Sequence, residues 1–212
     1  ITPTGEKYPS VTSVTGLLNK ESIKKWRKRV GEKKANKIST QAARHGTSAH
    51  QLFEDYIKGD NFEEKFKSAM PTTQQAFISL EEELNKIGTV HALEAPLYSH
   101  ELQMAGRVDC IAEYKNTPSI IDFKTSTKER NDDWNESYYI QASAYAEMFE
   151  ERTGIEINQI VILVVTEDGI VQEFVKDKSE YLEKLIDAVD DFTTDWEREN
   201  EVVHSSNDAV SA

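Results

Sequence analysis

The sequence predicts a mixed α/β fold, in which helices flank a β-sheet and an N-terminal helical portion precedes it. Two observations lead to this fold class. Apolar residues recur at helical spacing up to about residue 88, and alternating or β-branched runs then begin. From there the order is three strands, a helix, two strands and a helix. We therefore divide the chain into a helical portion (1–88), a core (89–200) and a polar tail (201–212).

The N-terminal portion consists of an initial loop and a series of helices. Residues 10–15 are β-branched and polar, and they fit either a short strand or the start of a helix. Helices are expected at 21–37, 41–58, 62–69 and 71–86. In the first of them Ile23, Trp26 and Val30 form an apolar stripe, which we assign to the core. Gly46 lies within the second and marks a break or a close approach to another segment.

The core is expected to hold one sheet and two helices. The strands lie at 90–97, 102–114, 119–126, 160–166 and 170–175, and the helices at 134–153 and 179–199. Residues 115–118 connect the second strand to the third. Asp168-Gly169 predicts a tight hairpin between the last two strands. The final helix is acidic and amphipathic, with its apolar residues facing inward.

Charge is distributed unevenly along the chain. The net charge is −13, yet residues 1–46 carry eleven Lys/Arg against three Asp/Glu, while residues 47–212 carry fourteen against thirty-five. A phosphate backbone responds to a local basic patch within a Debye length of about 8 Å, so the acidic balance does not exclude nucleic acid. We assign Lys24, Lys25 and Lys28 to substrate binding. A solvated helix face is the alternative interpretation of these lysines.

Two absences in the sequence narrow the class of protein. No apolar run approaches the ~20 residues that a membrane-spanning helix needs, so no membrane partner is expected. Cys110 is the only cysteine, which excludes an intrachain disulfide and a cysteine-ligated cluster. A reducing, intracellular compartment fits this composition.

Two carboxylates and a lysine stand on neighbouring predicted strands. Side chains alternate along a strand, so Asp122 and Lys124 point the same way. On the strand before, one face is expected to hold Leu102, Met104, Val108 and Cys110, and the other Gln103, Arg107 and Asp109. The offset of thirteen residues between Asp109 and Asp122 suits two adjacent antiparallel strands. These charged side chains are therefore expected to meet at one point of the sheet.

The chemistry that suits this group is metal-assisted hydrolysis of a phosphodiester. Magnesium takes carboxylate oxygens and keeps several waters, so Asp109 and Asp122 are the expected ligands, with the backbone carbonyl of Phe123 as a further one. Lys124 would orient the attacking water or hold a phosphate oxygen. Arg107 either balances the charge of Asp109 or contacts a phosphate. A D-x-K triplet also arises by chance as a surface ion pair.

Several short motifs in a fixed order extend this pattern. They are Gly46-Thr47-Ser48-Ala49-His50, Gly106-Arg107-Val108-Asp109, Asp122-Phe123-Lys124, and Gln141 with Tyr145. The set resembles the PD-(D/E)xK nucleases, and within them the RecB-like branch. Pro9-Ser10-Val11-Thr12 and Trp26-Arg27 are similar to segments of the mitochondrial genome maintenance exonuclease group and related phage exonucleases. The resemblance spans roughly residues 8–165.

The resemblance implies a restriction-endonuclease-like fold and a DNA exonuclease that acts on free single-stranded ends with Mg²⁺ or Mn²⁺. It also implies that His50 is a further metal ligand and that Glu94 adds an acidic group to the site. Gln141 and Tyr145 would contact DNA or brace the site, and Thr125 would cap or bind phosphate. Without the resemblance, His50 fits a core histidine and Gln141 with Tyr145 an ordinary helix pair.

The sequence leaves three alternatives open beside the exonuclease. They are a catalytically silent nucleic-acid-binding module of the same fold, a structure-selective endonuclease, and a structural protein with a basic arm. The location implied is intracellular: the cytoplasm of the host cell for a phage protein, or the mitochondrial matrix for a eukaryotic one. Residues 15–60 are the candidate for an arch over the site.

Overall fold

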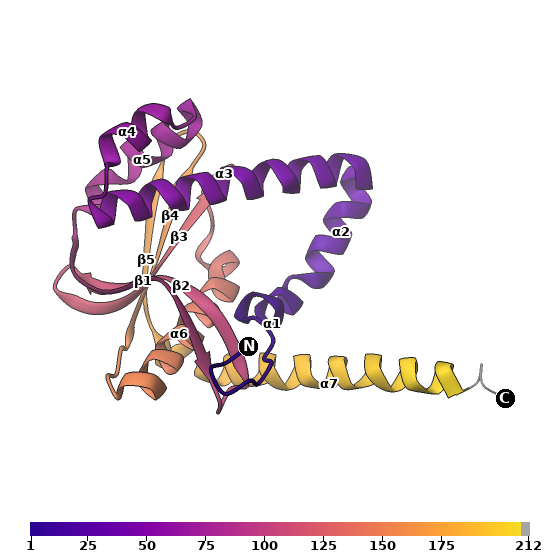
Figure 1. Ribbon diagram of the computed structural model, residues 1–212. Coiled ribbons are helices and arrows are strands. Elements are labelled where there is room, and N and C mark those ends of the chain that lie inside the picture. Colours follow the sequence, from indigo (N-terminus) through magenta and orange to yellow (C-terminus); the bar gives the residue numbers. More distant parts are fainter. Residues whose placement is uncertain (209–212) are drawn as a thin grey trace.

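A computed structural model describes the backbone of residues 1–208 and the side chains of residues 1–196 (Figure 1). The helices are α1 (Val11–Leu18), α2 (Lys20–Val30), α3 (Glu32–Lys58), α4 (Phe62–Ser68), α5 (Pro71–Leu84), α6 (Glu136–Thr153) and α7 (Leu182–Asp208). The strands are β1 (Ile87–Ser99), β2 (Met104–Tyr114), β3 (Thr117–Ser126), β4 (Gln159–Thr166) and β5 (Val171–Asp177). Two short 3₁₀ helices, η1 (Asp132–Asn135) and η2 (Lys178–Glu180), precede α6 and α7.

The strands form one mixed sheet in the order β1-β2-β3-β4-β5. Neighbours are antiparallel except β3 and β4, which are parallel and are joined through α6. Parallel neighbours need a crossover connection, and α6 provides it. The turn between β2 and β3 places Lys115 and Asn116 at φ +50° and +65°, as a two-residue hairpin with the twist of its strands requires. The predicted mixed sheet with flanking helices is confirmed.

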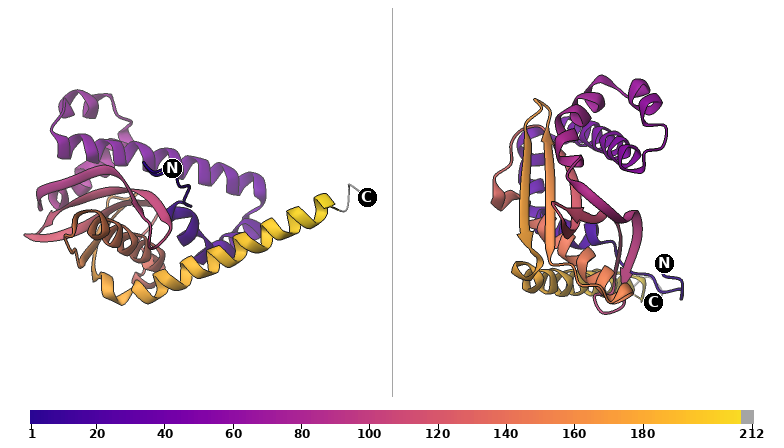
Figure 2. Two further views of the ribbon diagram at one scale, coloured as in Figure 1. Left: turned by 60° about the horizontal axis from the view of Figure 1, so that its bottom comes forward. Right: turned by 90° about the vertical axis from the view of Figure 1, so that its left-hand side faces the viewer.

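Helices cover both faces of the sheet. On one face α3, α4 and α5 pack over an apolar cluster that includes Phe53 and Phe77. On the other face α1, α6 and α7 pack over a second cluster that includes Ile140 and Leu185. Figure 2 shows α3 on one side of the sheet and α6 with α7 on the other. The burial of these two clusters holds the three layers together.

The sheet divides into two branches at one level. β2 pairs with β3 only along their turn-proximal halves, and the last pair is Cys110↔Ile121. Beyond that pair the first half of β2 stays with β1, and the second half of β3 stays with β4. Asp109 and Asp122 are the next residues on the two branches. Each strand therefore carries a carboxylate into the gap between the branches, which we call the fork. The register bears out the antiparallel offset expected from the sequence.

The N-terminal segment packs against the first half of β2. The amide of Ala105 donates to the carbonyl of Pro9 at 2.9 Å. Ser10 then caps α1, because its hydroxyl accepts from the amide of Ser13 at 3.0 Å. Val11 is fully buried. Residues 10–15, which fitted a strand or a helix, therefore begin a helix.

The predicted boundary between the helices at 21–37 and 41–58 is wrong. α3 runs unbroken from Glu32 to Lys58, and the chain turns instead at Gly31, whose φ is +90°. Glycine adopts this backbone conformation without the steric cost that other residues meet. Gly46 lies inside α3, where a Cβ would be 3.5 Å from Oγ1 of Thr125. That is ordinary contact distance, so α3 passes the end of β3 there without a break.

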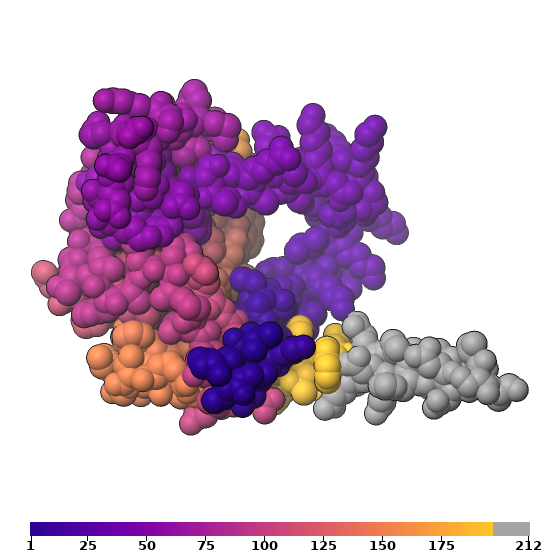
Figure 3. Space-filling view, viewed as in Figure 1, coloured from indigo at the N-terminus to yellow at the C-terminus, as the bar shows by residue number. Residues whose placement is uncertain are grey.

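The assignment of Ile23, Trp26 and Val30 to the core is also wrong. α2 contains no buried residue, and Ile23 is 49% exposed. The helix stands away from the body, and the space-filling view shows an opening between α2, the first half of α3 and the core (Figure 3). We call α2 with the first half of α3 (residues 20–46) the arch.

Two contacts close the arch onto the core. Gly46 lies against Thr125, as described, and Nδ2 of Asn19 donates to Oγ of Ser137 at 3.0 Å. Residues 126–135, which connect β3 to α6 and which we call the rim loop, complete the ring between these contacts. The arch, the two contacts and the rim loop therefore enclose the opening.

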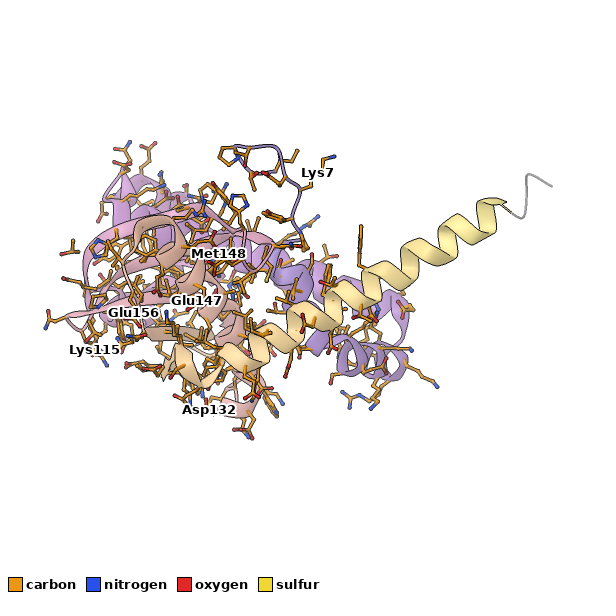
Figure 4. All side chains as sticks on the ribbon, turned by 90° about the horizontal axis from the view of Figure 1, so that it is seen from below. Lys7, Lys115, Asp132, Glu147, Met148 and Glu156 are labelled. Carbon is orange, nitrogen blue, oxygen red and sulfur yellow. The ribbon has the colours of Figure 1, made fainter. Side chains whose placement is uncertain are left out.

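α7 is longer than the predicted helix at 179–199. Asp177 and Glu180 form a capping box before it, and the helix continues to Asp208. Seen from below, it extends beyond the rest of the chain (Figure 4). The last four residues of the predicted polar tail, 209–212, lie outside the described residues. Over residues 1–208, no helix combines the length and apolar character needed to cross a membrane.

Candidate active site

Asp109 connects the two branches of the fork. Its Oδ2 accepts a hydrogen bond from the amide of Phe123 at 3.0 Å, and it lies 3.3 Å from Nδ1 of His50. The amide and carbonyl of a strand residue point to the same side, so the Phe123 carbonyl also faces β2, beyond the last β2–β3 pair. The carbonyl that the sequence marked as a ligand thus faces the fork.

His50, Glu94 and Asp109 form a cluster that can hold a cation. Each offers one ligand atom, and these atoms all lie within 4.8 Å of one another. His50 projects from α3, where its ring packs beside Phe53 and Phe123. Burial, and then the charges of Asp109 and nearby acidic groups, raise the pKa of Glu94 above its ordinary value.

The cluster depends on an irregularity that the sequence pattern does not reveal. Glu94 has φ +48°, a left-handed conformation that L-residues rarely adopt and that costs about 1–3 kcal/mol. The predicted shared face of Val108 and Cys110 is wrong, because Val108 packs in the cluster under α6 and Cys110 in the cluster under α3. The alternation of side chains along β2 is thus interrupted beside Asp109. The carboxylates of Glu94 and Asp109 both point toward α3 and His50.

Asp122 and Lys124 form a second group, on the face of β3 that α6 covers. Lys124 Nζ lies 2.8 Å from Oδ1 and 2.7 Å from Oδ2 of Asp122, which confirms that the two side chains point the same way. Burial raises the pKa of Asp122 to about 6, although Lys124 partly offsets it. Burial works against the charge of Lys124, but Asp122 and Asp109 outweigh it and raise the pKa of the ammonium. The ammonium thus pairs directly with Asp122, and the charge of Asp109 adds to the field that keeps it protonated.

Gln141 and Tyr145 support this second group from α6. Nε2 of Gln141 lies 3.5 Å from Oδ1 of Asp122, at the limit of a hydrogen bond. Gln141 is 8% exposed and Tyr145 2%, and burial raises the pKa of Tyr145 to about 12. The ring of Tyr145 occupies the space beside Gly106, where a Cβ would lie 2.8 Å from its Cε1 and hydroxyl oxygen. Gly106 and Tyr145, which belong to two separate motifs of the sequence, therefore fit together in the folded chain.

An open cavity of about 360 Å³ lies over the cation cluster. His50, Glu94, Arg107 and Asp109 line it, together with Gly46 and three residues that were not expected as site residues: Thr47, Gln51 and Glu54. These three stand at helical spacing around His50 on α3, and that spacing was the signal for them. Arg107 donates from Nη1 to the backbone carbonyl of Glu94 at 3.0 Å.

The remaining predicted site residues do not line this cavity. Thr125 contacts α3 at Gly46, and the three lysines assigned to substrate binding are exposed on α2. Lys24 Nζ lies 3.7 Å from a carboxylate oxygen of Glu21, and an exposed ion pair of this kind contributes little to the stability of the fold. Lys25 and Lys28 form no ion pair with the side chains that the structure describes. The lysines thus belong to the arch rather than to the cation cluster.

The donor set at the fork fits a divalent cation. Carboxylate oxygens suit magnesium and manganese, and an imidazole nitrogen adds a ligand that many divalent metals accept. Asp122 Oδ2 is buried and accepts no hydrogen bond from the described residues, although Lys124 Nζ lies 2.7 Å from it. The Lys124 ammonium already supplies a positive charge to this oxygen, so a metal ion bound here would share the carboxylate with it.

The sequence profile of the PD-(D/E)XK nuclease superfamily matches residues 21–208 of this chain, which is most of its length and includes every group at the fork. The chain belongs to the PD-(D/E)XK nuclease superfamily. The resemblance inferred from the motifs is thereby confirmed at the level of the superfamily, and with it the nuclease class of this protein.

Two curated relatives share the likeness at low identity. The chain is 26% identical over 175 residues to mitochondrial genome maintenance exonuclease 1 of Xenopus tropicalis, covering 76% of this chain and 50% of that protein. It is 26% identical over 133 residues to the mouse (Mus musculus) protein of that name, covering 57% and 38%. The chain thus spans half or less of these relatives.

Among solved structures, a candidate exonuclease of Eubacterium rectale superposes with a TM-score of 0.50 at 13% identity. The superposition covers 68% of this chain and 63% of that one. At this identity the match concerns the fold alone, and it agrees with the restriction-endonuclease-like fold expected from the motifs.

Proposed function

We propose that this nuclease is a DNA exonuclease that requires Mg²⁺ or Mn²⁺ and acts on free single-stranded ends. The observation that carries the proposal is the placement of two groups at one fork, a cation cluster on one side and an Asp–Lys pair on the other, next to an enclosed basic opening. Its place of action would be inside the cell, where such ends arise.

Residues from both branches would take part in hydrolysis. His50, Glu94 and Asp109 would hold a divalent cation, with Asp122 contributing from β3. When bound, such a cation stabilises charge on the phosphate and lowers the pKa of water. Lys124, kept charged by its two carboxylate neighbours, donates a hydrogen bond to a phosphate oxygen or to the attacking water. Gln141 and Tyr145 hold Asp122 and the strand of Gly106 in position.

The arch supports an end-dependent activity. A ring closed by the Gly46–Thr125 and Asn19–Ser137 contacts admits a flexible strand end first, whereas a circular strand has no end to insert. The arch is basic: its Lys/Arg residues are Lys20, Lys24, Lys25, Arg27, Lys28, Arg29, Lys33, Lys34, Lys37 and Arg44, against Glu21 and Glu32. Such a surface attracts a phosphate backbone.

The proposal is tested by comparing a linear single strand with the same sequence closed into a circle. With Mg²⁺ or Mn²⁺ the linear strand should be degraded and the circle should persist; with EDTA neither should be cut. Cleavage of the circle at a comparable rate would identify an endonuclease instead. Hydrolysis that persists in EDTA would contradict the metal requirement.

We expect the arch lysines to set the salt dependence of DNA binding. Replacing Lys24, Lys25, Lys28 and Lys33 by glutamine should weaken binding, because fewer phosphates are then neutralised. The slope of log affinity against log salt should become shallower by about 0.7 for each phosphate that the variant no longer neutralises. The measurement is fluorescence anisotropy of a labelled single strand in EDTA over a salt series.

The matched control removes four lysines outside the arch instead, giving the same change in net charge. These are Lys58, Lys65, Lys115 and Lys184, which pair with acidic neighbours. The control should keep the wild-type slope. An equal change of slope in both proteins would show that net charge, and not the arch, governs binding.

A further inference from the structure

The rim loop holds an arginine whose position is fixed by neutral partners. The side chain of Gln172 binds both backbone groups of Arg130: its Oε1 accepts from the amide at 2.7 Å, and its Nε2 donates to the carbonyl at 3.0 Å. The guanidinium donates from Nε to Oδ1 of Asn135 at 2.5 Å and from Nη2 to the carbonyl of Trp134. The loop therefore presents this side chain in one defined place.

No carboxylate among the described side chains pairs with the guanidinium of Arg130. Both acceptors of its guanidinium are uncharged oxygens, and they engage two of its five N–H groups. Among the side chains of residues 1–196, no carboxylate oxygen lies within 4.0 Å of its nitrogens. A fixed guanidinium with N–H groups to spare is a binding site for an anion, and its planar fork matches a phosphate.

Tyr138 links this arginine to the Asp–Lys pair. Its ring centroid is 4.9 Å from Cζ of Arg130 and 4.8 Å from Nζ of Lys124. Cations are attracted to the face of an aromatic ring, so Tyr138 keeps the two close together despite their repulsion. An anion that spans the two cations would relieve that repulsion. Lys124 already faces the fork, so the guanidinium of Arg130 extends the site toward the rim loop.

Trp134, next to Arg130 in the chain fold, indicates which anion fits. It is 53% exposed, and Nζ of Lys128 lies 5.4 Å from its ring. Exposed aromatic rings stack with the bases of single-stranded nucleic acids, so a phosphate here would be accompanied by a surface for its base. This combination favours a nucleotide of a single strand over a free inorganic anion.

We propose that Arg130 binds the backbone phosphate adjacent to the scissile phosphate, on the strand that passes the rim loop. This inference rests on the proposed function, because it takes Lys124 as the group at the scissile phosphate. Arg130 is thus a substrate-binding residue that sets the register of the strand, and Tyr138 is the positioning residue between it and Lys124.

The test is a cycle that changes the arginine and the phosphate separately. Single-stranded oligonucleotides of about 12 nucleotides carry one uncharged methylphosphonate at successive distances from the free end, and their affinities are measured in EDTA. For the wild type, one position next to the scissile linkage should weaken binding at least about 10-fold, as expected for a lost charged hydrogen bond. For Arg130→Gln, every oligonucleotide except the one modified at that position should bind more weakly, and that position should cease to matter.

Two further variants separate charge from loop structure. Arg130→Lys keeps a cation without the two guanidinium hydrogen bonds, and it should retain sensitivity at the same position with a smaller effect. Arg152→Gln is the matched control: Cζ of Arg152 stacks 4.3 Å from the ring of Tyr98, but it lies about 20 Å along α6 from Tyr138. It should keep the wild-type profile.

The outcomes distinguish this inference from the proposed function. If wild type binds and degrades single strands but Arg130→Gln and Arg130→Lys both keep its methylphosphonate profile, the phosphate site at Arg130 is overturned and the exonuclease proposal stands. If wild type neither binds nor degrades single strands, both fail together.

Discussion

Replacing Asp122 by asparagine, or Lys124 by methionine, should lower the rate of hydrolysis of linear single-stranded DNA at least about 100-fold, a loss of about 2.7 kcal/mol of transition-state stabilisation. Each change removes a charged group that the proposed chemistry uses at the fork. The measurement is the initial rate with saturating Mg²⁺ or Mn²⁺. Asp187→Asn, which changes an exposed carboxylate on α7, is the control and should keep the wild-type rate.

The same two variants should differ in stability. Asp122→Asn replaces a carboxylate whose charge is disfavoured by burial with a neutral amide, so in EDTA at pH 8 it should raise the unfolding temperature. Lys124→Met leaves the buried carboxylate of Asp122 without its cation, and removing one partner from a buried pair costs about 3–5 kcal/mol. Loss of activity together with opposite shifts in stability would separate a role in chemistry from simple misfolding.

The pH dependence follows from the raised pKa of Asp122. The folded chain takes up a proton there near pH 6, whereas an unfolded chain does so near the ordinary value of 3.8. In EDTA, the stability of the wild type relative to Asp122→Asn should therefore increase as pH falls from about 8 to 5. If the difference between the two proteins were constant over this range, the raised pKa would be refuted.

Gly106→Ala should destabilise the protein by about 1–3 kcal/mol, the usual cost of overpacking a buried position. The new methyl group would lie 2.8 Å from the ring of Tyr145 and 3.1 Å from Cγ2 of Val11, so one of these must move. Tyr145 stands beside the fork and Val11 begins α1, so activity should fall as well. Chemical denaturation measures the stability change.

A second glycine provides the control for this prediction. Gly16 lies within α1, and nothing is within 4 Å of the position that its Cβ would take. Gly16→Ala should therefore be neutral or stabilising by up to about 1 kcal/mol. In the double variant Gly106→Ala/Tyr145→Leu, the combined destabilisation should be smaller than the sum of the two single effects. Strict additivity would show that the two positions do not clash.

Local sequence patterns predicted much of this fold because the rules involved, such as alternation along a strand, act between residues that are near one another in the chain. Alternation along β3 placed Asp122 and Lys124 together, as the structure bears out. The offset to Asp109 predicted an antiparallel pair, and the pairing register agrees. Asp168-Gly169 predicted a hairpin, and Gly169 has φ +86° in the turn between β4 and β5. These features need no knowledge of distant contacts.

The features that the sequence did not predict depend on what packs against each segment. The stripe of Ile23, Trp26 and Val30 correctly indicates an amphipathic helix, but no pattern within α2 reveals that it stands away from the core. The left-handed conformation of Glu94 has no glycine to mark it in the sequence. The role of Gly106 depends on a tyrosine 39 positions later, which only the folded chain brings beside it.

The measurement that tests the central claim most directly is an anomalous difference map from crystals grown with Mn²⁺. We expect one strong peak at the fork, with Asp109 and at least one of His50, Glu94 and Asp122 as ligands, at metal–oxygen distances of about 2.0–2.2 Å. The peak should vanish in crystals of Asp109→Asn. A manganese ion bound elsewhere, with none at the fork of a protein that degrades DNA, would contradict the proposed metal centre.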